Sequence, residues 1–436
     1  MASVAIRREE NELETRTPLT PDDINYLKSK VNIETFVQPA KNRIFSDDEF
    51  KRKGAIIEED IHLRSDLTIG LNEIPAELIQ KNKLYLFSTQ LYKKKENLKL
   101  LLKKMASSKS TLIDYERITD KNEKQLIHFG NIAGNAGMID SLWALGKKLY
   151  SQGLETPFLK INQTFKYSSL EIAIQSLKQL GKEIDIIGLN YFDGPLIIGI
   201  LGNGIVCKGA IEIINCFSNQ ELKPDELEEF FESGFYSENK IYFVIFQEKN
   251  LVKPKELEDD FDLQDYYENP SKYESQFAKY IPYLTVIINA TYWDNKYPKF
   301  ITIDSVKKLF EGGLSILRVI GDITCIENGS NELTIQTTTI NQPLYEFNLN
   351  TKQANKDLIG KGPAILAIDN LFLELPKESS RYFSSELKKY IPQIIKEKLP
   401  ETFEQCTFPE EIKKGIIMYK GKLTPNYTYL QELIVK

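Results

Sequence analysis

The chain has 436 residues, of which 42% are hydrophobic, and a formal net charge of −6. This length predicts two or three domains, and the interspersed charges exclude the basic surface that nucleic-acid binding requires. Two histidines, and four cysteines without a C-x-x-C spacing, argue against a metal site, and no apolar run approaches a membrane span. The N-terminus, M-A-S-V-A-I-R-R-E-E, fits neither a secretory signal nor a transit peptide, so a cytoplasmic location is expected.

The N-terminal third alternates apolar strand patterns with helical ones. Helix starts are marked by Thr20-Pro21 and by Ser46 with the acids after it. A helix at 93–105 turns its leucines inward and its lysines to solvent. This alternation predicts an α/β lobe with a mainly parallel sheet. The predicted strands span residues 4–6, 33–37, 55–57, 67–71, 84–87 and 111–114.

The central stretch, residues 197–210, reads I-I-G-I-L-G-N-G-I-V-C-K-G-A. It predicts a buried strand, a turn at Gly202 and Gly204, and a helix N-terminus whose free N–H groups favour a pyrophosphate. The spacing G-x-G-x(4)-G departs from the G-x-G-x-x-G pattern, so an ordinary strand-to-helix turn is the alternative. The candidate cofactor-binding residues are Gly202, Asn203, Gly204, Ile205, Val206 and Gly209.

A short second strand is expected near residues 221–223. No acid stands clearly at its end to hold a ribose 2′-hydroxyl, whereas Lys223 would suit a 2′-phosphate, which favours NADP(H) over NAD(H). The remaining pattern predicts long helices at 129–149 and 168–180, strands at 241–246, 284–289 and 314–323, an insertion of helices and loops at 250–280, and an amphipathic helix at 379–398.

Several motifs occur together in one order along the chain. They are R-R-E-x-x-x-x-E-x-R-x-P-L-T-P at 7–21, L-I-D-Y-E at 112–116, F-G-N-I-A-G-N-A-G-M at 129–138, L-G-N-G-I-V-C-K-G-A at 201–210, I-N-A-T-Y-W at 288–293 and I-D-N-L-F-L-E-L-P-K-E-S at 368–379. In these motifs the chain resembles the lysine–ketoglutarate reductase part of α-aminoadipic semialdehyde synthase. It is more distantly similar to saccharopine dehydrogenases, alanine dehydrogenase and transhydrogenase.

The resemblance implies two Rossmann-like lobes with a cleft between them. Residues 1–140 with 345–436 would form the substrate-side lobe, and residues 141–344 the dinucleotide-binding lobe. It also implies that the ε-amine of lysine joins 2-oxoglutarate as an imine, which NADPH reduces to saccharopine. This chemistry requires proton carriers and cations that hold carboxylates.

The family's acid–base residues are not preserved. Asn72 stands where the family has lysine and Thr89 where it has histidine, and neither side chain titrates near neutral pH. The family arginine before F-G-x-x-A-G is replaced near Lys124, and a further family lysine falls at Tyr92, where Lys93 could substitute after a one-residue slip. The substrate-binding candidates are Glu14, Arg16, Lys93, Glu116 and Asp322. Arg16 could instead pair with Glu14, and Glu116 could instead cap a turn.

Three hypotheses follow from these residues. The first is a saccharopine-forming oxidoreductase with replacement proton carriers such as Lys93, Lys124 or Glu116. The second is a catalytically silent nucleotide-binding homologue, and the third is a dehydrogenase for another amino or keto acid. Because the sequence ends at Lys436 without a saccharopine-cleaving half, a separate enzyme is expected to take up any product.

Overall fold

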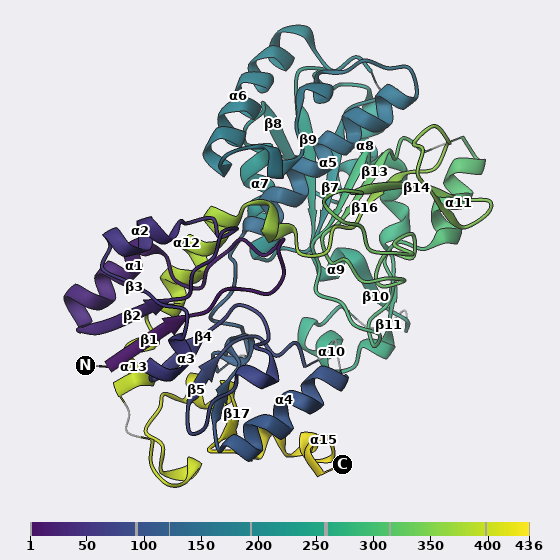
Figure 1. The fold of residues 1–436 in the computed structure, drawn as a ribbon. Coiled ribbons are helices and arrows are strands. Elements are labelled where there is room, and N and C mark those ends of the chain that lie inside the picture. Colours follow the sequence, from purple (N-terminus) through teal and green to yellow (C-terminus); the bar gives the residue numbers. More distant parts are fainter. Residues whose placement is uncertain are drawn as a thin grey trace. The chain divides into compact units, whose positions relative to one another are not determined.

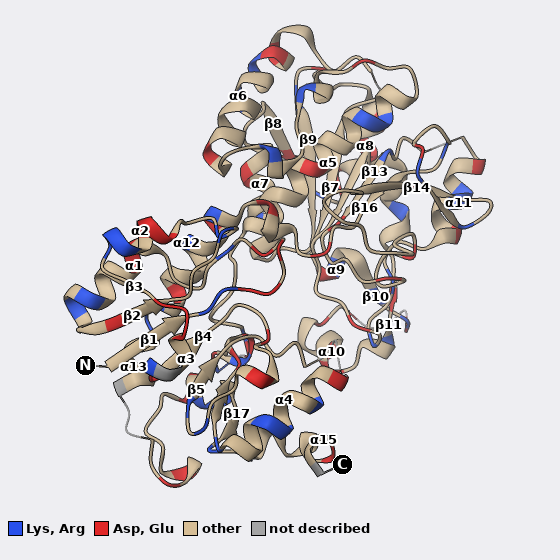
Figure 2. Ribbon diagram, in the orientation of Figure 1, with Lys and Arg blue, Asp and Glu red and all other residues tan. Residues whose placement is uncertain are grey.

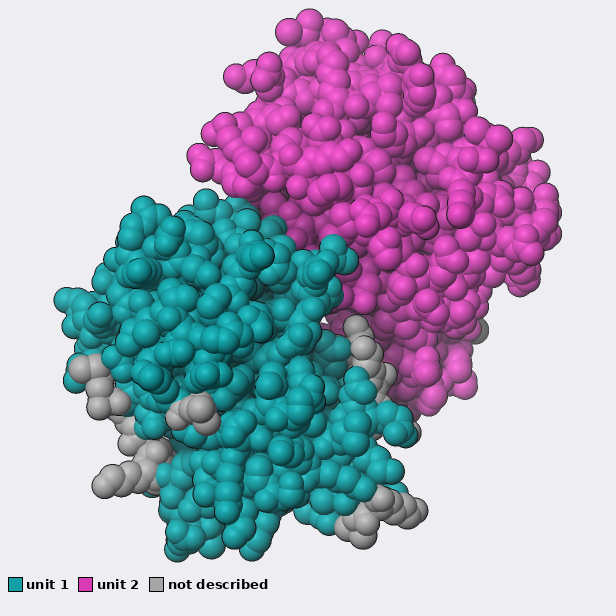
Figure 3. Space-filling model, in the orientation of Figure 1, with its two compact units in different colours: residues 1–130, 376–436 teal, residues 131–375 magenta. Residues whose placement is uncertain are grey.

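The computed structural model describes residues 2–91, 95–121, 123–191, 194–256, 260–313, 315–396 and 399–435. The chain divides into two compact units, residues 1–130 with 376–436 and residues 131–375, which Figure 3 shows in separate colours. Each unit has its own mainly parallel sheet flanked by helices (Figure 1). The predicted α/β class with two Rossmann-like lobes is therefore confirmed.

The first unit has the sheet order β18-β17-β6-β5-β4-β1-β2-β3, in which only β17 and β18 run antiparallel to their neighbours. Its strands are β1 (Ala2–Ile6), β2 (Ile33–Val37), β3 (Ile56–Ile57), β4 (Leu67–Ile69), β5 (Leu84–Leu86), β6 (Thr111–Ile113), β17 (Ile416–Tyr419) and β18 (Lys422–Leu423). Its α-helices are α1 (Pro21–Tyr26), α2 (Asp47–Arg52), α3 (Ile61–Arg64), α4 (Lys95–Ser108), α12 (Pro376–Leu387), α13 (Ile391–Lys396), α14 (Glu410–Gly415) and α15 (Gln431–Val435).

The predicted helix starts in this unit are confirmed. The Thr20 hydroxyl accepts a hydrogen bond from the Asp23 N–H at the start of α1. At the start of α2, Ser46 and Glu49 cap each other's backbone N–H reciprocally. These side chains satisfy donors that the first helical turn leaves without an intrahelical partner.

The second unit has the sheet order β15-β14-β16-β13-β12-β7-β9-β8, parallel from β16 to β8. Its strands are β7 (Ile197–Leu201), β8 (Asn219–Leu222), β9 (Ile241–Phe246), β10 (Val252–Pro254), β11 (Tyr273–Ser275), β12 (Val286–Asn289), β13 (Val319–Asp322), β14 (Leu344–Asn348), β15 (Gln353–Asn355) and β16 (Ala364–Leu366). Its α-helices are α5 (Ile132–Ser151), α6 (Leu170–Ile187), α7 (Ile205–Ile214), α8 (Leu227–Ser233), α9 (Glu248–Leu251), α10 (Leu263–Glu268) and α11 (Ile303–Glu311).

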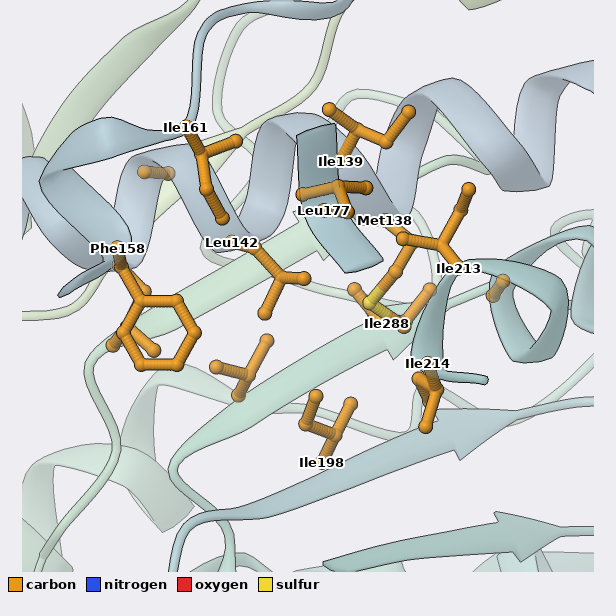
Figure 4. Close-up of a cluster of buried hydrophobic side chains, with 14 of the residues drawn as sticks. Met138, Ile139, Leu142, Phe158, Ile161, Leu177, Ile198, Ile213, Ile214 and Ile288 are labelled. Atoms are coloured by element: carbon orange, nitrogen blue, oxygen red, sulfur yellow. The ribbon is translucent and has the colours of Figure 1, made fainter. Parts of the chain in front are cut away.

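The core of the second unit is formed where α5 and α7 pack on the sheet. Figure 4 shows Met138 and Leu142 of α5 together with Ile213 of α7 and Ile198 of β7. The two helices approach so closely that a Cβ added at Gly209 would lie 2.1 Å from the carbonyl oxygen of Asn131. Gly209 therefore serves close helix packing, which holds the N-terminal turn of α7 against the unit.

The division into units differs from the boundaries expected at 140/141 and 344/345. Helix α5 begins at Ile132 and packs on α7 and β13, so residues 131–140 lie in the second unit. Strands β14 to β16, residues 344–366, extend the second sheet and not the first. The chain returns to the first unit only at Pro376.

Two expectations about local structure were wrong. The helix predicted at 379–398 is broken into α12 and α13, because Pro392 near the start of α13 has no N–H to donate to Lys388. The insertion at 250–280 contains the antiparallel pair β10–β11 in addition to helices and loops.

Acidic and basic residues are interspersed along both units (Figure 2). Over the described ranges, no helix is long and apolar enough to cross a membrane.

Candidate functional site

Four loops of the first unit meet at one edge of its sheet. Strands β6, β5, β4 and β1 are adjacent and parallel, so the segments that follow them leave the sheet on the same side. Five predicted site residues lie on these segments, and hydrogen bonds link the segments in pairs. They are Glu14 and Arg16 after β1, Asn72 after β4, Thr89 after β5 and Glu116 after β6.

Asn72 is bound by two carboxylates of the segment after β1. Its amide nitrogen donates to Oε2 of Glu9 at 3.0 Å and to Oε2 of Glu14 at 3.2 Å. Glu9 also accepts hydrogen bonds from the backbone N–H groups of Leu71 and Asn72. Burial, and next the charge of Glu14, raise the pKa of Glu9. A half-buried carboxyl group with a raised pKa thus lies beside Asn72.

Arg16 forms a closed ion pair with Glu14. Its Nε donates to Oε1 of Glu14 at 2.7 Å and its Nη2 to Oε2 at 2.5 Å. Both side chains are 4% exposed, and the guanidinium lies 4.1 Å from the ring centroid of Phe129. The structure therefore shows Arg16 as an ion-pair partner of Glu14.

Thr89 is hydrogen-bonded to Asp114 at the end of β6. The threonine hydroxyl donates to Oδ2 of Asp114 at 2.5 Å and its backbone N–H donates to the same oxygen at 3.0 Å. Burial is the main cause that raises the pKa of Asp114 to about 6, and the neighbouring charge of Glu116 adds to it. A group that titrates near the usual range of histidine is thus hydrogen-bonded to Thr89.

Glu116 lies next to this pair. It accepts a hydrogen bond from the Ser88 hydroxyl at 2.7 Å, and its backbone N–H donates to Oδ1 of Asp114 at 2.9 Å. The backbone contact is a turn cap that Asp114 provides, while the half-buried carboxylate of Glu116 remains at the sheet edge.

The other predicted residues of the substrate site lie elsewhere. Tyr92 and Lys93 fall outside the described residues. Lys124 is exposed in the turn that closes on Asp120. Asp322 ends β13 in the second unit, where it is buried and accepts hydrogen bonds from Asn289 and Thr334. Burial raises its pKa to about 6.

A second candidate site is the glycine turn after β7. Gly202 has a φ of +96°, and a Cβ there would lie 2.9 Å from the carbonyl oxygen of Ala290. Gly204 caps α7 without a side-chain hydrogen bond, and a Cβ there would meet nothing within 4 Å. The N–H groups of Ile205 and Val206 in the first turn have no acceptor four residues earlier within the helix. This open helix N-terminus fits a pyrophosphate.

Two cavities adjoin this turn, and Asn203 lines both. The larger, about 630 Å³, lies between the ends of β8 and β9 and is lined by Lys223, Gln247 and Lys249 among others. The smaller, about 220 Å³, is lined by Gly202, Gly204, Glu248 and several aromatic side chains.

The strand predicted after the glycine turn and its helix is present, but it does not lie beside β7. Residues 219–222 form β8, as expected, yet β8 is the edge strand and β9 lies between it and β7. Lys223 at the end of β8 is exposed and pairs with Glu226 at 2.9 Å. The residues beside the glycine turn are therefore those that follow β9.

Three residues of these sites, Glu9, Asp114 and Glu248, are not among the candidates named from the sequence. Glu9 belongs to the R-R-E motif, and Asp114 ends a predicted strand, so their proximity to Asn72 and Thr89 could have been inferred from parallel strand ends. Glu248 follows the strand predicted at 241–246 after Gln247, and its position beside the glycine turn depends on the strand order. Among the side chains that the structure describes, no group of three or more His, Cys, Asp or Glu is placed to hold a metal ion.

Comparison with known proteins supports the resemblance. Residues 5–136 match the family "Alanine dehydrogenase/PNT, N-terminal domain". The chain is 32% identical to an α-aminoadipic semialdehyde synthase of Arabidopsis thaliana, over 97% of this chain and 40% of that protein. It is 25% identical to a saccharopine dehydrogenase [NAD(+), L-lysine-forming] of Emericella nidulans, over 89% of this chain and 91% of that one. The solved structure of an L-alanine dehydrogenase superposes with a TM-score of 0.58 at 15% identity, covering 99% of both chains.

These findings confirm homology to α-aminoadipic semialdehyde synthases and a fold shared with L-alanine dehydrogenase. The chain spans less than half the length of the α-aminoadipic semialdehyde synthases that it matches.

Proposed function

We propose that this chain, a homologue of α-aminoadipic semialdehyde synthases, is a nicotinamide-dinucleotide-dependent oxidoreductase of the saccharopine-forming type. Its substrates would be lysine and 2-oxoglutarate, as the resemblance implies. The observation that carries the proposal is the open glycine turn at the carboxyl end of β7, with uncapped N–H groups at the start of α7. The name of the Emericella nidulans relative, which specifies NAD(+) and lysine, supports the same chemistry.

The dinucleotide would be held by residues of the second unit. Gly202, Asn203 and Gly204 would contact the pyrophosphate, together with the N–H groups of Ile205 and Val206. When bound, the nicotinamide supplies the hydride for reduction of an imine. The chain's own contribution is to bind the anion and to orient it at the end of β7.

A Gly204→Ala change tests this assignment. The added methyl group meets no atom within 4 Å, so we expect the unfolding temperature to fall only slightly, by the cost of alanine at an N-cap. Binding of NADH and NADPH should weaken by about tenfold or more, because the methyl group occupies space that the pyrophosphate needs. Gly202→Ala provides the contrast, since its positive φ and the contact with Ala290 should lower the unfolding temperature more. Calorimetric titration and thermal unfolding of both variants measure the two effects, and undiminished binding to Gly204→Ala would count against the glycine turn.

In this proposal, carboxyl groups transfer the protons. Asn72 and Thr89 carry no titrating proton, but each is hydrogen-bonded to an acid whose pKa is raised, Glu9 and Asp114. Glu9 would accept a proton of the substrate ammonium directly. Thr89 would take a proton from the substrate as its hydroxyl passes one to Asp114, and the reverse transfer would return a proton to the departing carbinolamine hydroxyl, which leaves as water.

Replacing the two acids separately tests these roles. Glu9→Gln and Asp114→Asn should each lower kcat for saccharopine formation by about 10²–10⁴-fold, the usual contribution of a general acid or base. Because Asp114 has a pKa of about 6 and acts in its ionised form, activity of the unchanged protein should rise with pH through about 6. NADH binding, measured on the same variants, should not change. A kcat that is indifferent to both changes would exclude the two acids as proton carriers.

A catalytically silent nucleotide-binding homologue is the second candidate. It is favoured by the closed Arg16–Glu14 pair, which leaves little of either side chain exposed. The deciding experiment mixes the full chain and NADH or NADPH with lysine, with 2-oxoglutarate, or with both, and follows coenzyme oxidation. Oxidation only with both substrates supports the enzyme, and binding without oxidation supports the silent homologue.

Restoring the family residues separates these candidates further. Asn72→Lys would place an ammonium between Glu9 and Glu14, and Thr89→His would place an imidazole beside Asp114. If the native chain is silent, the double variant should raise saccharopine formation above background, and Asn72→Lys alone serves as the less disruptive control. A native activity that the double change abolishes would exclude the silent homologue.

A further inference from the structure

The strand that flanks the glycine turn is β9, not β8. In the usual dinucleotide-binding sheet, the strand after the first helix lies beside the first strand and ends in the residue that contacts the adenosine ribose. Here that place is taken by β9, in which Phe246 pairs with Leu201 at the end of β7. The backbone N–H of Gly202 donates to the carbonyl oxygen of Phe246 at 2.8 Å, which ties the turn to the end of β9.

Glu248 is the acid that follows this strand. It is half-buried at the start of α9 and lines the smaller cavity together with Gly202 and Gly204. The hydroxyl of Tyr267 donates to its Oε1 at 3.0 Å, while no described residue donates to its Oε2. One carboxylate oxygen is thus fixed in position and the other remains available to accept hydrogen bonds from a ligand.

The rest of this cavity suits an adenosine. Its aromatic wall includes Tyr266, Tyr267, Tyr297 and Phe300, and Tyr266 packs on Tyr297 with 5.3 Å between ring centroids. Flat aromatic surfaces of this kind bind the faces of heterocyclic rings. The described residues that line this cavity include no lysine or arginine, so a 2′-phosphate would meet the charge of Glu248 without a compensating cation.

The lysines lie in the other cavity. Lys223 and Lys249 line the space between the ends of β8 and β9, and Lys223 is already paired with Glu226. Because β9 lies between β8 and β7, Lys223 at the end of β8 is one strand away from the glycine turn.

We propose that Glu248 accepts hydrogen bonds from the adenosine ribose hydroxyls of NAD(H), so that this chain selects NAD(H) over NADP(H). The inference rests on the dinucleotide site of the proposed function and specifies its ligand. It also makes Glu248, with its support from Tyr267, the residue that determines coenzyme specificity.

Binding of NADH and NADPH to the purified full chain tests the assignment without any need for turnover. Both tryptophans, Trp143 and Trp293, lie in the second unit, so energy transfer from tryptophan to bound reduced coenzyme provides the signal. We expect NADH to bind at least about tenfold more tightly than NADPH. In Glu248→Gln, which removes the charge but keeps the shape, the ratio of the two dissociation constants should fall toward one.

Glu221→Gln is the matched control, because Glu221 lines the larger cavity only. It should leave the NADH preference unchanged, and thermal unfolding should show both variants to be folded. Tighter binding of NADPH, lost in Lys223→Ala or Lys249→Ala, would overturn the inference and place the adenosine in the larger cavity. Binding of both coenzymes with a ratio that Glu248→Gln does not change would overturn the role of Glu248 alone. Absence of binding to either coenzyme would overturn the proposed function together with this inference.

Discussion

Replacing Lys148 by methionine is expected to destabilise the second unit by about 3–5 kcal/mol, the usual cost of breaking a buried ion pair from one side. Lys148 on α5 is fully buried, and its Nζ donates to Oε2 of Glu346 on β14 at 2.5 Å. It also donates to the carbonyl oxygens of Leu358 and Gly360 at 2.9 and 2.8 Å. The change would leave the carboxylate of Glu346 buried without a counter-ion and Gly360 without this donor.

Urea unfolding followed by tryptophan fluorescence measures this effect, because both tryptophans report on the second unit. The control is the double variant Lys148→Met with Glu346→Leu, which removes both charges and should recover much of the lost stability. Recovery should be incomplete, since the carbonyl oxygen of Gly360 still lacks the lysine, whereas that of Leu358 keeps a hydrogen bond from Ser151 at 2.6 Å. Equal unfolding free energies for the native chain and Lys148→Met would show that the ion pair contributes nothing to the unit.

Local patterns predicted the elements of the fold well. Thr20 and Ser46 cap helices as expected, and the turn at Gly202 lies between a buried strand and a helix. Local patterns predict these elements because capping, burial and glycine turns depend on residues close together in the chain. Asn72 and Thr89, by contrast, are singled out by the family resemblance and not by a local pattern.

Long-range pairing was not predictable in the same way. The strand at 219–222 is polar and mostly exposed, whereas the strand at 241–246 is apolar and buried, as suits an edge and an interior strand. The pairing of these strands decides which one flanks β7. The proposed coenzyme contact is therefore Glu248, after β9, in place of Lys223, after β8. The boundaries of the units differ from the expected ones for the same reason, because β14 joins the second sheet by pairing with β16. The bond from Lys148 of α5 to Glu346 holds β14 to that unit as well.

A buried pair of acids in the second unit likewise depends on long-range contacts that local patterns do not predict. Asp140 on α5 accepts hydrogen bonds from the backbone N–H and hydroxyl of Thr164, at 2.7 and 2.9 Å. Glu374, in the short 3₁₀-helix η9 (Leu371–Glu374), accepts one from the N–H of Phe165 at 3.1 Å. The remaining oxygens, Oδ2 of Asp140 and Oε1 of Glu374, are buried without a donor group. A proton shared between the two carboxyl groups satisfies both oxygens, and burial, followed by the charge of Asp140, raises the pKa of Glu374 well above its usual range.

Replacing Glu374 by glutamine should therefore change how the stability of the second unit depends on pH. The folded unit keeps a proton that the unfolded chain releases above about pH 5, so the native chain should lose stability as the pH rises, by up to about 1.4 kcal/mol per pH unit. Glutamine donates a permanent hydrogen bond to Asp140, and the variant should show a flatter dependence and greater stability at about pH 8. Urea unfolding at several pH values measures the slopes, with Glu229→Gln, an exposed acid on α8, as the control that should follow the native chain. Parallel slopes for the native chain and Glu374→Gln would contradict the shared proton, since a pair that ionises fully in the folded state has no proton to lose on unfolding.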